Sequence, residues 1–275
     1  MGRNYCCADL HIHSTYSDGL LTPSEIIKIC KELQLKAIAI TDHDSVSGVE
    51  ETIHAAQKSI DVIPAVEMSS NIGVLDIHIL GYYIDIRNGE LVSYLEDFQQ
   101  HRIERAKKMI EKLADDGIKL DFNQIKENAK NAALGRPHIA EALIENGYVH
   151  SINEAFIRYL GYHSQYYEPK KNIHPKQVIQ NIKDWGGVPV IAHPGTIHRE
   201  GLTNQLIMEG AAGIEVWHPD HTQSLQQELY EIALKNRLVM TGGSDYHGFR
   251  GSYDQIGKCG CSEKEVIMLK EIAGI

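Results

Sequence analysis

Short apolar runs alternate with amphipathic helical segments at both ends of the 275-residue chain, and this alternation most restricts the possible fold. For example, a helix is predicted to begin at Pro23, where Thr22 and Glu25 form a capping box. Such alternation favours parallel strands with helices packed outside them. The predicted strands are Tyr5–Leu10, Lys36–Ile40, Val62–Val66, Val74–Leu80, Val188–Ala192, Gly213–Val216 and Leu238–Thr241.

The middle of the chain interrupts this pattern. From about residue 90 to residue 159 the apolar spacing is helical, and no segment has the composition of a strand. A helical block between two β/α regions predicts an insertion on a barrel. We therefore expect an α/β fold in which residues 1–90 and 171–275 form the barrel and residues 91–170 form an all-helical insertion.

Histidines and acids gather at or just after the carboxyl ends of the predicted strands. In the stretch ADLHIHSTYSDG, His11 and His13 lie on the same side of a strand because side chains alternate, and the following turn brings Asp18 near. In β/α barrels this end of the strands is the active-site face. The other candidates, from the motifs TDHD, VEMSS, DIHIL, AHPG and GGSDYHG, are His43, Glu67, His78, His193, Asp245 and His247.

Each candidate alone has an ordinary alternative, such as a hydrogen-bonded loop histidine or a helix-capping acid. Burying many imidazoles and carboxylates together without a cation costs on the order of several kcal/mol. Divalent metal ions remove this cost, so the combined pattern predicts a metal site. Imidazole and carboxylate ligands without thiolate suit Mn²⁺, Fe²⁺ or Zn²⁺ and do not choose among them.

Composition limits the partners. The formal net charge of −10 argues against binding to long nucleic acids, long DNA included, or to anionic membranes. No apolar run approaches the roughly 20 residues that span a bilayer, and the N-terminus lacks the apolar segment of a secretory signal. The five cysteines follow no regular spacing, which is typical of a reducing compartment. We therefore expect a cytoplasmic protein that binds a small substrate.

The motifs DLHIHSTYSDG, TDHD, AHPG and GGSDYHG, together with Glu67 and His78, occur in the order found in the PHP (polymerase and histidinol phosphatase) family. The chain resembles that family over nearly its whole length. The segment GRPHIAEALIENGYVHSINEAFIRYLG, at 135–161, resembles the insertion of the branch that contains nucleotidases and 5′-trimming ribonucleases.

This resemblance implies a distorted (β/α)₇ barrel with three divalent metal ions. The implied ligands are His11, His13, Glu67 and Asp245 for the first ion, Glu67, His78 and His193 for the second, and Asp18, His43 and His247 for the third.

Arg136 and Lys170 are candidates for binding substrate phosphate. Arg136 precedes Pro137 at the predicted start of a helix, where free N–H groups and a guanidinium together suit a phosphate. Lys170 lies near the return from the insertion to the barrel. The alternative for both is a solvated surface charge. His198 and Arg199, shortly after the AHPG motif, are further candidates.

Three other residues border the predicted metal site. Asp42 and Asp44 flank His43 and could orient its ring, although Asp44 could instead cap the next helix. His218 follows a predicted strand and could protonate a leaving oxygen, or it could be a hydrogen-bonded loop histidine.

Clustered divalent ions activate water and polarise phosphoryl oxygens, so the pattern favours hydrolysis of phosphate esters. The resemblance implies removal of the 3′-phosphate from nucleoside 3′,5′-bisphosphates and trimming of short 5′-phosphorylated RNA. A phosphatase for another small phosphomonoester, such as histidinol phosphate, stays open. So does a non-catalytic scaffold, although such a module would have lost ligands and this chain retains them.

Overall fold

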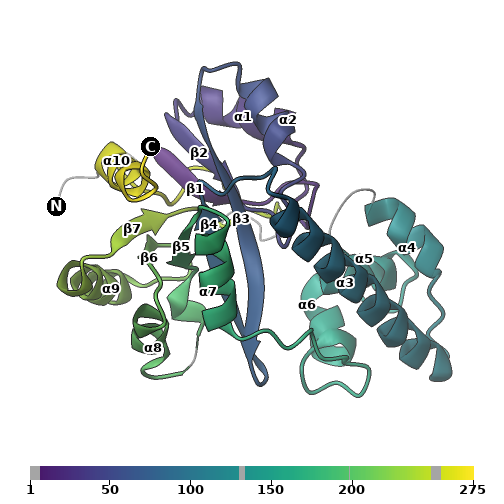
Figure 1. The fold of residues 1–275 in the computed structure, drawn as a ribbon. Coiled ribbons are helices and arrows are strands. Elements are labelled where there is room, and N and C mark those ends of the chain that lie inside the picture. The colour runs from purple at the N-terminus through teal and green to yellow at the C-terminus, as the bar shows by residue number, and fades with distance from the viewer. Residues whose placement is uncertain (1–6, 130–133, 198, 249–254) are drawn as a thin grey trace.

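The computed structural model describes residues 7–129, 134–197, 199–248 and 255–275. Its strands form one seven-stranded sheet in which spatial order follows chain order (Figure 1). The strands are β1 (Ala8–Ile12), β2 (Ala37–Ile40), β3 (Asp61–Ile72), β4 (Leu75–Tyr82), β5 (Val188–Ile191), β6 (Gly213–Trp217) and β7 (Val239–Gly242).

The sheet curls into a nearly closed barrel. β1, β2 and β3 pair in parallel, and so do β5, β6 and β7. At the seam, Ile12 at the end of β1 forms a parallel bridge with Tyr246, which follows β7. Across the barrel, the buried Tyr82 hydroxyl donates a hydrogen bond of 2.7 Å to the carbonyl of Leu10. The distorted (β/α)₇ barrel expected from the sequence is confirmed.

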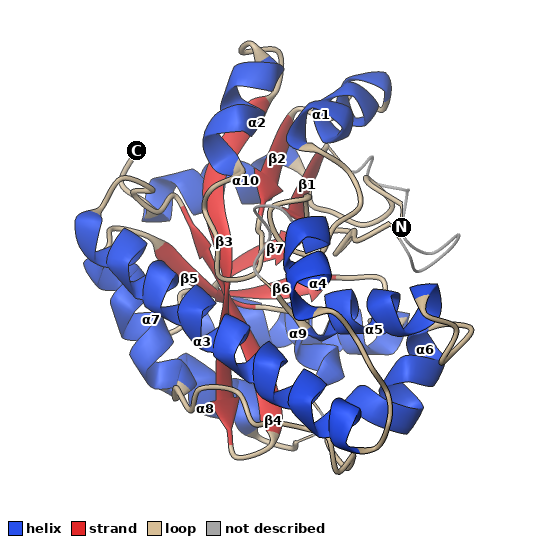
Figure 2. Ribbon diagram, turned by 90° about the vertical axis from the view of Figure 1, so that its right-hand side faces the viewer, coloured by secondary structure: helices blue, strands red, loops and turns tan. Residues whose placement is uncertain are grey.

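The expectation of parallel strands is wrong for β4, which runs antiparallel to both β3 and β5. β3 continues beyond the predicted end at Val66, turns at Gly73 with φ of +63°, and returns as β4. The two strands form a long hairpin that extends past the rest of the sheet (Figure 2). Ser70 lies beyond the end of the predicted strand, but it is buried in β3 and its hydroxyl donates to the Ile77 carbonyl at 2.6 Å.

Helices surround the barrel and bury its outer face (Figure 1). α10 is not among the helices predicted from apolar spacing, although Ser262 and Glu265 form a capping box at its start. The barrel helices are α1 (Pro23–Glu32), α2 (Val49–Ala56), α7 (Pro175–Asp184), α8 (Leu202–Met208), α9 (Gln223–Asn236) and α10 (Glu263–Ile272). A short 3₁₀ turn, η2 (Pro194–Thr196), follows β5.

The expected helical insertion lies beside the β3–β4 hairpin (Figure 1). It consists of α3 (Gly89–Asp115), α4 (Phe122–Ala129), α5 (Arg136–Glu145), α6 (Ile152–Ala155) and the π-helix η1 (Phe156–Leu160).

The insertion has its own hydrophobic cluster, whose buried members lie between Ala106 and Leu160. Near the start of α3, however, Leu91 and Leu95 belong to a barrel cluster. Because one helix contributes to both cores, the domain boundaries at residues 90 and 170 stay predictions. Within the described ranges, no helix is both long enough and apolar enough to span a bilayer.

Candidate metal centre

The nine predicted metal ligands come from six strands or the loops that follow them, and they meet at one end of the barrel. His11 lies on β1 and His13 just after it, and their ring centroids are 5.2 Å apart. The backbone of Gly243 passes so close to His11 that a Cβ at this glycine would lie 2.3 Å from the His11 Cβ. This glycine therefore lets the loop after β7 bring Asp245 and His247 beside the histidines of β1.

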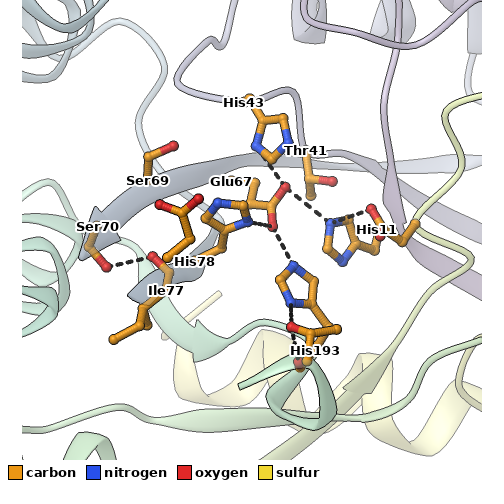
Figure 3. A network of polar contacts seen from close by, with 12 residues as sticks. His11, Thr41, His43, Glu67, Ser69, Ser70, Ile77, His78 and His193 are labelled. Atoms are coloured by element: carbon orange, nitrogen blue, oxygen red, sulfur yellow. Dashed lines mark hydrogen bonds and ion pairs between the residues drawn. The ribbon is translucent and has the colours of Figure 1, made fainter. Parts of the chain in front are cut away.

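Glu67 lies at the centre of the site (Figure 3). It is fully buried on β3, and each of its two carboxylate oxygens is surrounded by histidine rings. The nearest imidazole nitrogens, at 2.9 to 3.4 Å, belong to His11, His13, His43, His78 and His193. A carboxylate with ring nitrogens close to both oxygens is suited to bridge two metal ions.

The potential ligand atoms form three groups, and within each group all the atoms lie within 4.8 Å of one another. The groups are His11, His13, Glu67 and Asp245; His13, Asp18, His43 and His247; and His43, Glu67 and His78. The first group coincides with the ligand set implied for the first ion. His193 is absent from the third group, but its Nε2 lies 2.9 Å from Glu67 Oε1.

Several of these atoms are buried without a hydrogen-bond partner in the described part of the chain. They are His11 Nε2, His13 Nε2, Asp18 Oδ1, His43 Nδ1, Glu67 Oε2 and both ring nitrogens of His78. His13 Nε2 lies 3.2 Å from both Glu67 Oε2 and Asp245 Oδ1, a separation found between ligands whose bonds to one ion are about 2.1 Å long. These residues therefore fit a cluster of divalent cations.

The electrostatics of the site also call for positive charge. Burial alone would raise the pKa of Glu67, but His43, His78 and His11 hold it well below its usual value. Burial would lower the pKa of His13, yet Asp245 and Glu67 raise it to about 10. Without metal ions, a proton on His13 therefore helps to balance the buried carboxylates, and a metal ion bound by this ring would displace that proton.

A second layer of buried residues holds the ligands. Glu215, on β6, accepts hydrogen bonds from the Nδ1 of His11 at 3.0 Å and from the backbone N–H of His193 at 2.7 Å. Asp9 accepts the N–H groups of Ser244, at 2.9 Å, and Gly257, at 2.7 Å. Sequence reasoning missed both acids, although Glu215 is a charged residue within an otherwise apolar strand.

The two acids that flank His43 bond elsewhere. Asp42 accepts hydrogen bonds from the hydroxyls of Ser14 and Ser17, each at 2.7 Å. Asp44 accepts from the Nε of Arg102 and from the hydroxyl of Ser69, each at 2.9 Å. The described hydrogen bonds thus do not connect either acid to the His43 ring, and α2 begins after Gly48 rather than at Asp44. Both acids hold the loops on which the ligands lie.

His218 is buried, and both of its ring nitrogens are hydrogen bonded. Nδ1 accepts the backbone N–H of Asp220 at 3.1 Å, so Nε2 carries the proton and donates to Asp245 at 3.3 Å. These contacts are those of a hydrogen-bonded histidine, and a role of His218 in protonating a leaving oxygen stays a prediction.

A cavity of about 360 Å³ opens above the ligands. Asp18, Glu67, His78 and Asp245 line one side of it, and the cations that line it are Arg102, Arg105, Arg136 and Lys170. His198 lies outside the described residues, and Arg199 is not among the residues that line this cavity.

Asp76, on β4, holds the two predicted phosphate-binding residues in place. The Nζ of Lys170 lies 3.0 Å from Asp76 Oδ2, and Nη2 of Arg136 lies 3.6 Å from the same oxygen. Arg136 also lies over the ring of Tyr162, with 4.7 Å between the guanidinium carbon and the ring centroid. Both cations are therefore largely enclosed and held at the cavity by Asp76, with 13% of the Arg136 side chain and 15% of the Lys170 side chain exposed.

Arg105, which lines this cavity together with Arg102, is a further cation that sequence reasoning missed. Its Nη2 is buried and has no hydrogen-bond partner among the described residues. Burial and the neighbouring Arg136 lower its pKa to about 10. The signal in the sequence is its spacing from Arg102, since side chains three positions apart lie on the same face of a helix.

Comparisons with known proteins agree with this geometry. A family model described as PHP domain matches residues 9–155, which is more than half of the chain. A 5′-3′ exoribonuclease of Haemophilus influenzae is 31% identical over 256 residues, covering 91% of this chain and 93% of that protein. A 3′,5′-nucleoside bisphosphate phosphatase of Chromobacterium violaceum is 32% identical over 246 residues, covering 87% and 86%.

Among solved structures, a Bifidobacterium adolescentis protein assigned as a metal-dependent phosphoesterase has a TM-score of 0.89 at 28% identity. That likeness covers 98% of this chain and 96% of the other. Because the family model spans β1 to β4 and the relatives extend over most of the remaining barrel, the chain belongs to the PHP domain family.

Proposed function

We propose that this PHP-family phosphoesterase hydrolyses phosphate esters of small nucleotides. Its main reaction is removal of the 3′-phosphate from nucleoside 3′,5′-bisphosphates, and short 5′-phosphorylated RNA is a second substrate. The observation that carries the proposal is a single cavity with a metal-binding side and a cationic side. The relatives named a nucleoside bisphosphate phosphatase and an exoribonuclease support the same substrate class.

Three divalent ions, of Mn, Fe or Zn, belong to this proposal. The ligands proposed for them are His11, His13, Asp18, His43, Glu67, His78, His193, Asp245 and His247. Bound there, such ions supply an activated water and neutralise charge on the phosphoryl oxygens. A cytoplasmic location is also part of the proposal.

The protein's own residues hold the substrate. Arg136 and Lys170, with Arg105 beside them, bind the phosphate that is not cleaved, because a guanidinium donates two parallel hydrogen bonds to phosphate oxygens. Ile152 and Phe156 line the same cavity and offer apolar contacts to the nucleoside. When the retained 5′-phosphate binds on the cationic side, the 3′-phosphate that is cleaved lies against the metal ligands.

Phosphate release from a panel of substrates tests this function with the metal-reconstituted protein. The panel contains 3′-phosphoadenosine 5′-phosphate, 3′-AMP, 5′-AMP, histidinol phosphate, a nucleoside 2′,3′-cyclic phosphate and oligoribonucleotides with and without a 5′-phosphate. Hydrogen bonds to charged groups contribute about 1.5–3 kcal/mol, so we expect kcat/KM for the bisphosphate to exceed that for 3′-AMP by about 10- to 100-fold.

Arg136→Met should lower the ratio of kcat/KM for the bisphosphate to kcat/KM for 3′-AMP. The substitution removes a group that contacts only the phosphate that is retained. Equal kcat/KM for the bisphosphate and 3′-AMP in the wild type would contradict the proposal that the cationic side of the cavity binds a second phosphate. A preference for histidinol phosphate would assign the other phosphatase function. Absence of release from every substrate would favour the scaffold.

A further inference from the structure

Glu215 is a buried acid that contacts two proposed metal ligands at once. It lies on β6 with no exposed surface, and it is not among the residues that line the cavity. Its Oε1 accepts from the His11 ring, and its Oε2 accepts from the backbone N–H of His193. His193 has φ of +25°, an unusual backbone conformation for a residue other than glycine, and this hydrogen bond helps to hold it there.

The hydrogen bond to His11 decides which ring nitrogen can bind a metal. An ionised carboxylate only accepts hydrogen bonds, so a proton must lie on Nδ1 of His11. The lone pair of Nε2 is then available, and this nitrogen lies 3.4 Å from both Glu67 Oε2 and Asp245 Oδ1. With Glu215 ionised, the ring therefore presents its metal-binding nitrogen to the centre of the first ligand group.

We propose that Glu215 is the positioning residue that fixes the tautomer of His11 and the backbone of His193, and thereby sets the metal affinity of the site. It acts only through these two ligands and does not contact the cavity. The proposal rests on the proposed metal centre but not on the identity of the substrate.

Glu215→Gln tests the proposal with almost no change in shape. An amide has one acceptor and one donor, whereas both partners of Glu215 donate. If the amide oxygen accepts from His193, the NH₂ group faces Nδ1 of His11 and favours a proton on Nε2, where it blocks metal binding. If the amide is reversed, the N–H of His193 loses its acceptor.

Metal-free Glu215→Gln protein can satisfy both of its partners, because His11 with a proton on Nε2 faces Glu67 and Asp245. We therefore expect the thermal midpoint of the metal-free variant to stay within about 3 °C of the wild type. Its affinity for Mn²⁺ or Zn²⁺, measured by chelator competition, should fall by about 10- to 100-fold. Glu50→Gln, which changes an exposed acid paired with Arg87, is the matched control and should bind metal as the wild type does.

A double variant separates positioning from a general structural effect. In a His11→Ala background, Glu215→Gln should weaken metal binding by less than about threefold, because the His11 ring is gone and the amide oxygen can still accept from the N–H of His193. A full loss in that background overturns the proposal. The proposal is also overturned if Glu215→Gln alone binds metal with wild-type affinity. It is overturned as well if Glu215→Gln lowers the thermal midpoint by the same amount with and without metal.

Nitrogen NMR of the Zn²⁺-loaded wild type provides a test that needs no variant. With ring-labelled histidine, His11 should carry a proton on Nδ1 and bind metal through Nε2. Binding through Nδ1 overturns the proposal. Absence of bound metal in the wild type would instead contradict the metal centre itself, so the two failures can be distinguished.

Discussion

At the scale of single residues, the charge on Lys170 predicts how substrate binding depends on pH. Burial lowers its pKa to about 8, although Asp76 opposes this shift. Lys170 is therefore charged below about pH 8 and becomes neutral as the pH rises further. We expect the ratio of kcat/KM for a nucleoside bisphosphate to that for 3′-AMP to fall as the pH rises through 8.

The ratio of two substrates removes pH effects that both share, such as those of the metal centre. Lys170→Arg is the control, because arginine keeps its charge throughout this range and should flatten the profile. A profile that is unchanged in Lys170→Arg would show that another group causes the inflection.

A second residue-scale prediction concerns His78. Both of its ring nitrogens are buried without hydrogen-bond partners among the described residues, and its Nδ1 lies 2.9 Å from Glu67. His78→Ala removes a proposed ligand, so the metal content per chain measured by elemental analysis should fall by about one ion. His101→Ala, on the exposed face of α3, should leave the content unchanged. Full metal content in His78→Ala would exclude this histidine as a ligand.

Candidate ligands at strand ends could be predicted from the sequence. Residues whose role depends on contacts with distant elements could not. His11 and His13 share a face because strand side chains alternate, a rule that needs only the local sequence. Glu215 and Arg105 meet partners on other strands or helices, such as Glu215 with His11 across 204 positions. Such contacts depend on the register of the strands and the placement of the insertion, which no local pattern contains.

At the scale of elements, a buried ion pair joins α3 to the loop after β2. Arg102 donates to Asp44 and Ser69, and it holds the pKa of Asp44 below its usual value against the effect of burial. Arg102→Met leaves the Asp44 carboxylate buried without its partner. We expect the free energy of unfolding in urea to fall by about 3–5 kcal/mol at pH 7.

Arg87→Met provides the comparison, because Arg87 and Glu50 form an exposed ion pair. Such a pair contributes about 0–1 kcal/mol. Since the pKa of Asp44 is depressed in the folded protein, the stabilisation is present above its unfolded pKa and is lost as the pH falls through the folded pKa. If the free energy of unfolding falls equally in Arg102→Met and Arg87→Met, the Arg102–Asp44 pair contributes no more to stability than an exposed ion pair.

The hairpin of β3 and β4 shows where prediction from pattern fails. The rhythm of apolar runs located most strands, and capping boxes located the start of α1. The predicted strand ended at Val66, whereas Ser69, Ser70 and Asn71 are buried near the end of β3, where it pairs with the antiparallel β4. Their hydrogen bonds to partners such as the Ile77 carbonyl are tertiary, so composition alone gave the wrong ending for β3 and the wrong direction for β4.

At the scale of the whole molecule, the proposed metal ligands tie the first strand to the last, whereas the insertion contains none of them. The insertion is stabilised by its own apolar cluster between Ala106 and Leu160. Removing metal should therefore destabilise the barrel more than the insertion. Saturation at a thousand times the dissociation constant contributes about 4 kcal/mol, so chelation should lower the thermal midpoint by about 10 °C.

Hydrogen exchange measured by mass spectrometry can separate the two regions. After chelation we expect faster exchange in β1 and in the loop from Gly243 to Gly248, where ligands lose their ion. Peptides from α5, between Arg136 and Glu145, should keep the same protection, because their buried apolar residues pack in the cluster of the insertion. If α5 loses protection to the same extent as β1, the barrel and the insertion unfold as one cooperative unit that α3 joins. The apolar cluster of the insertion then does not stabilise the insertion independently of the barrel.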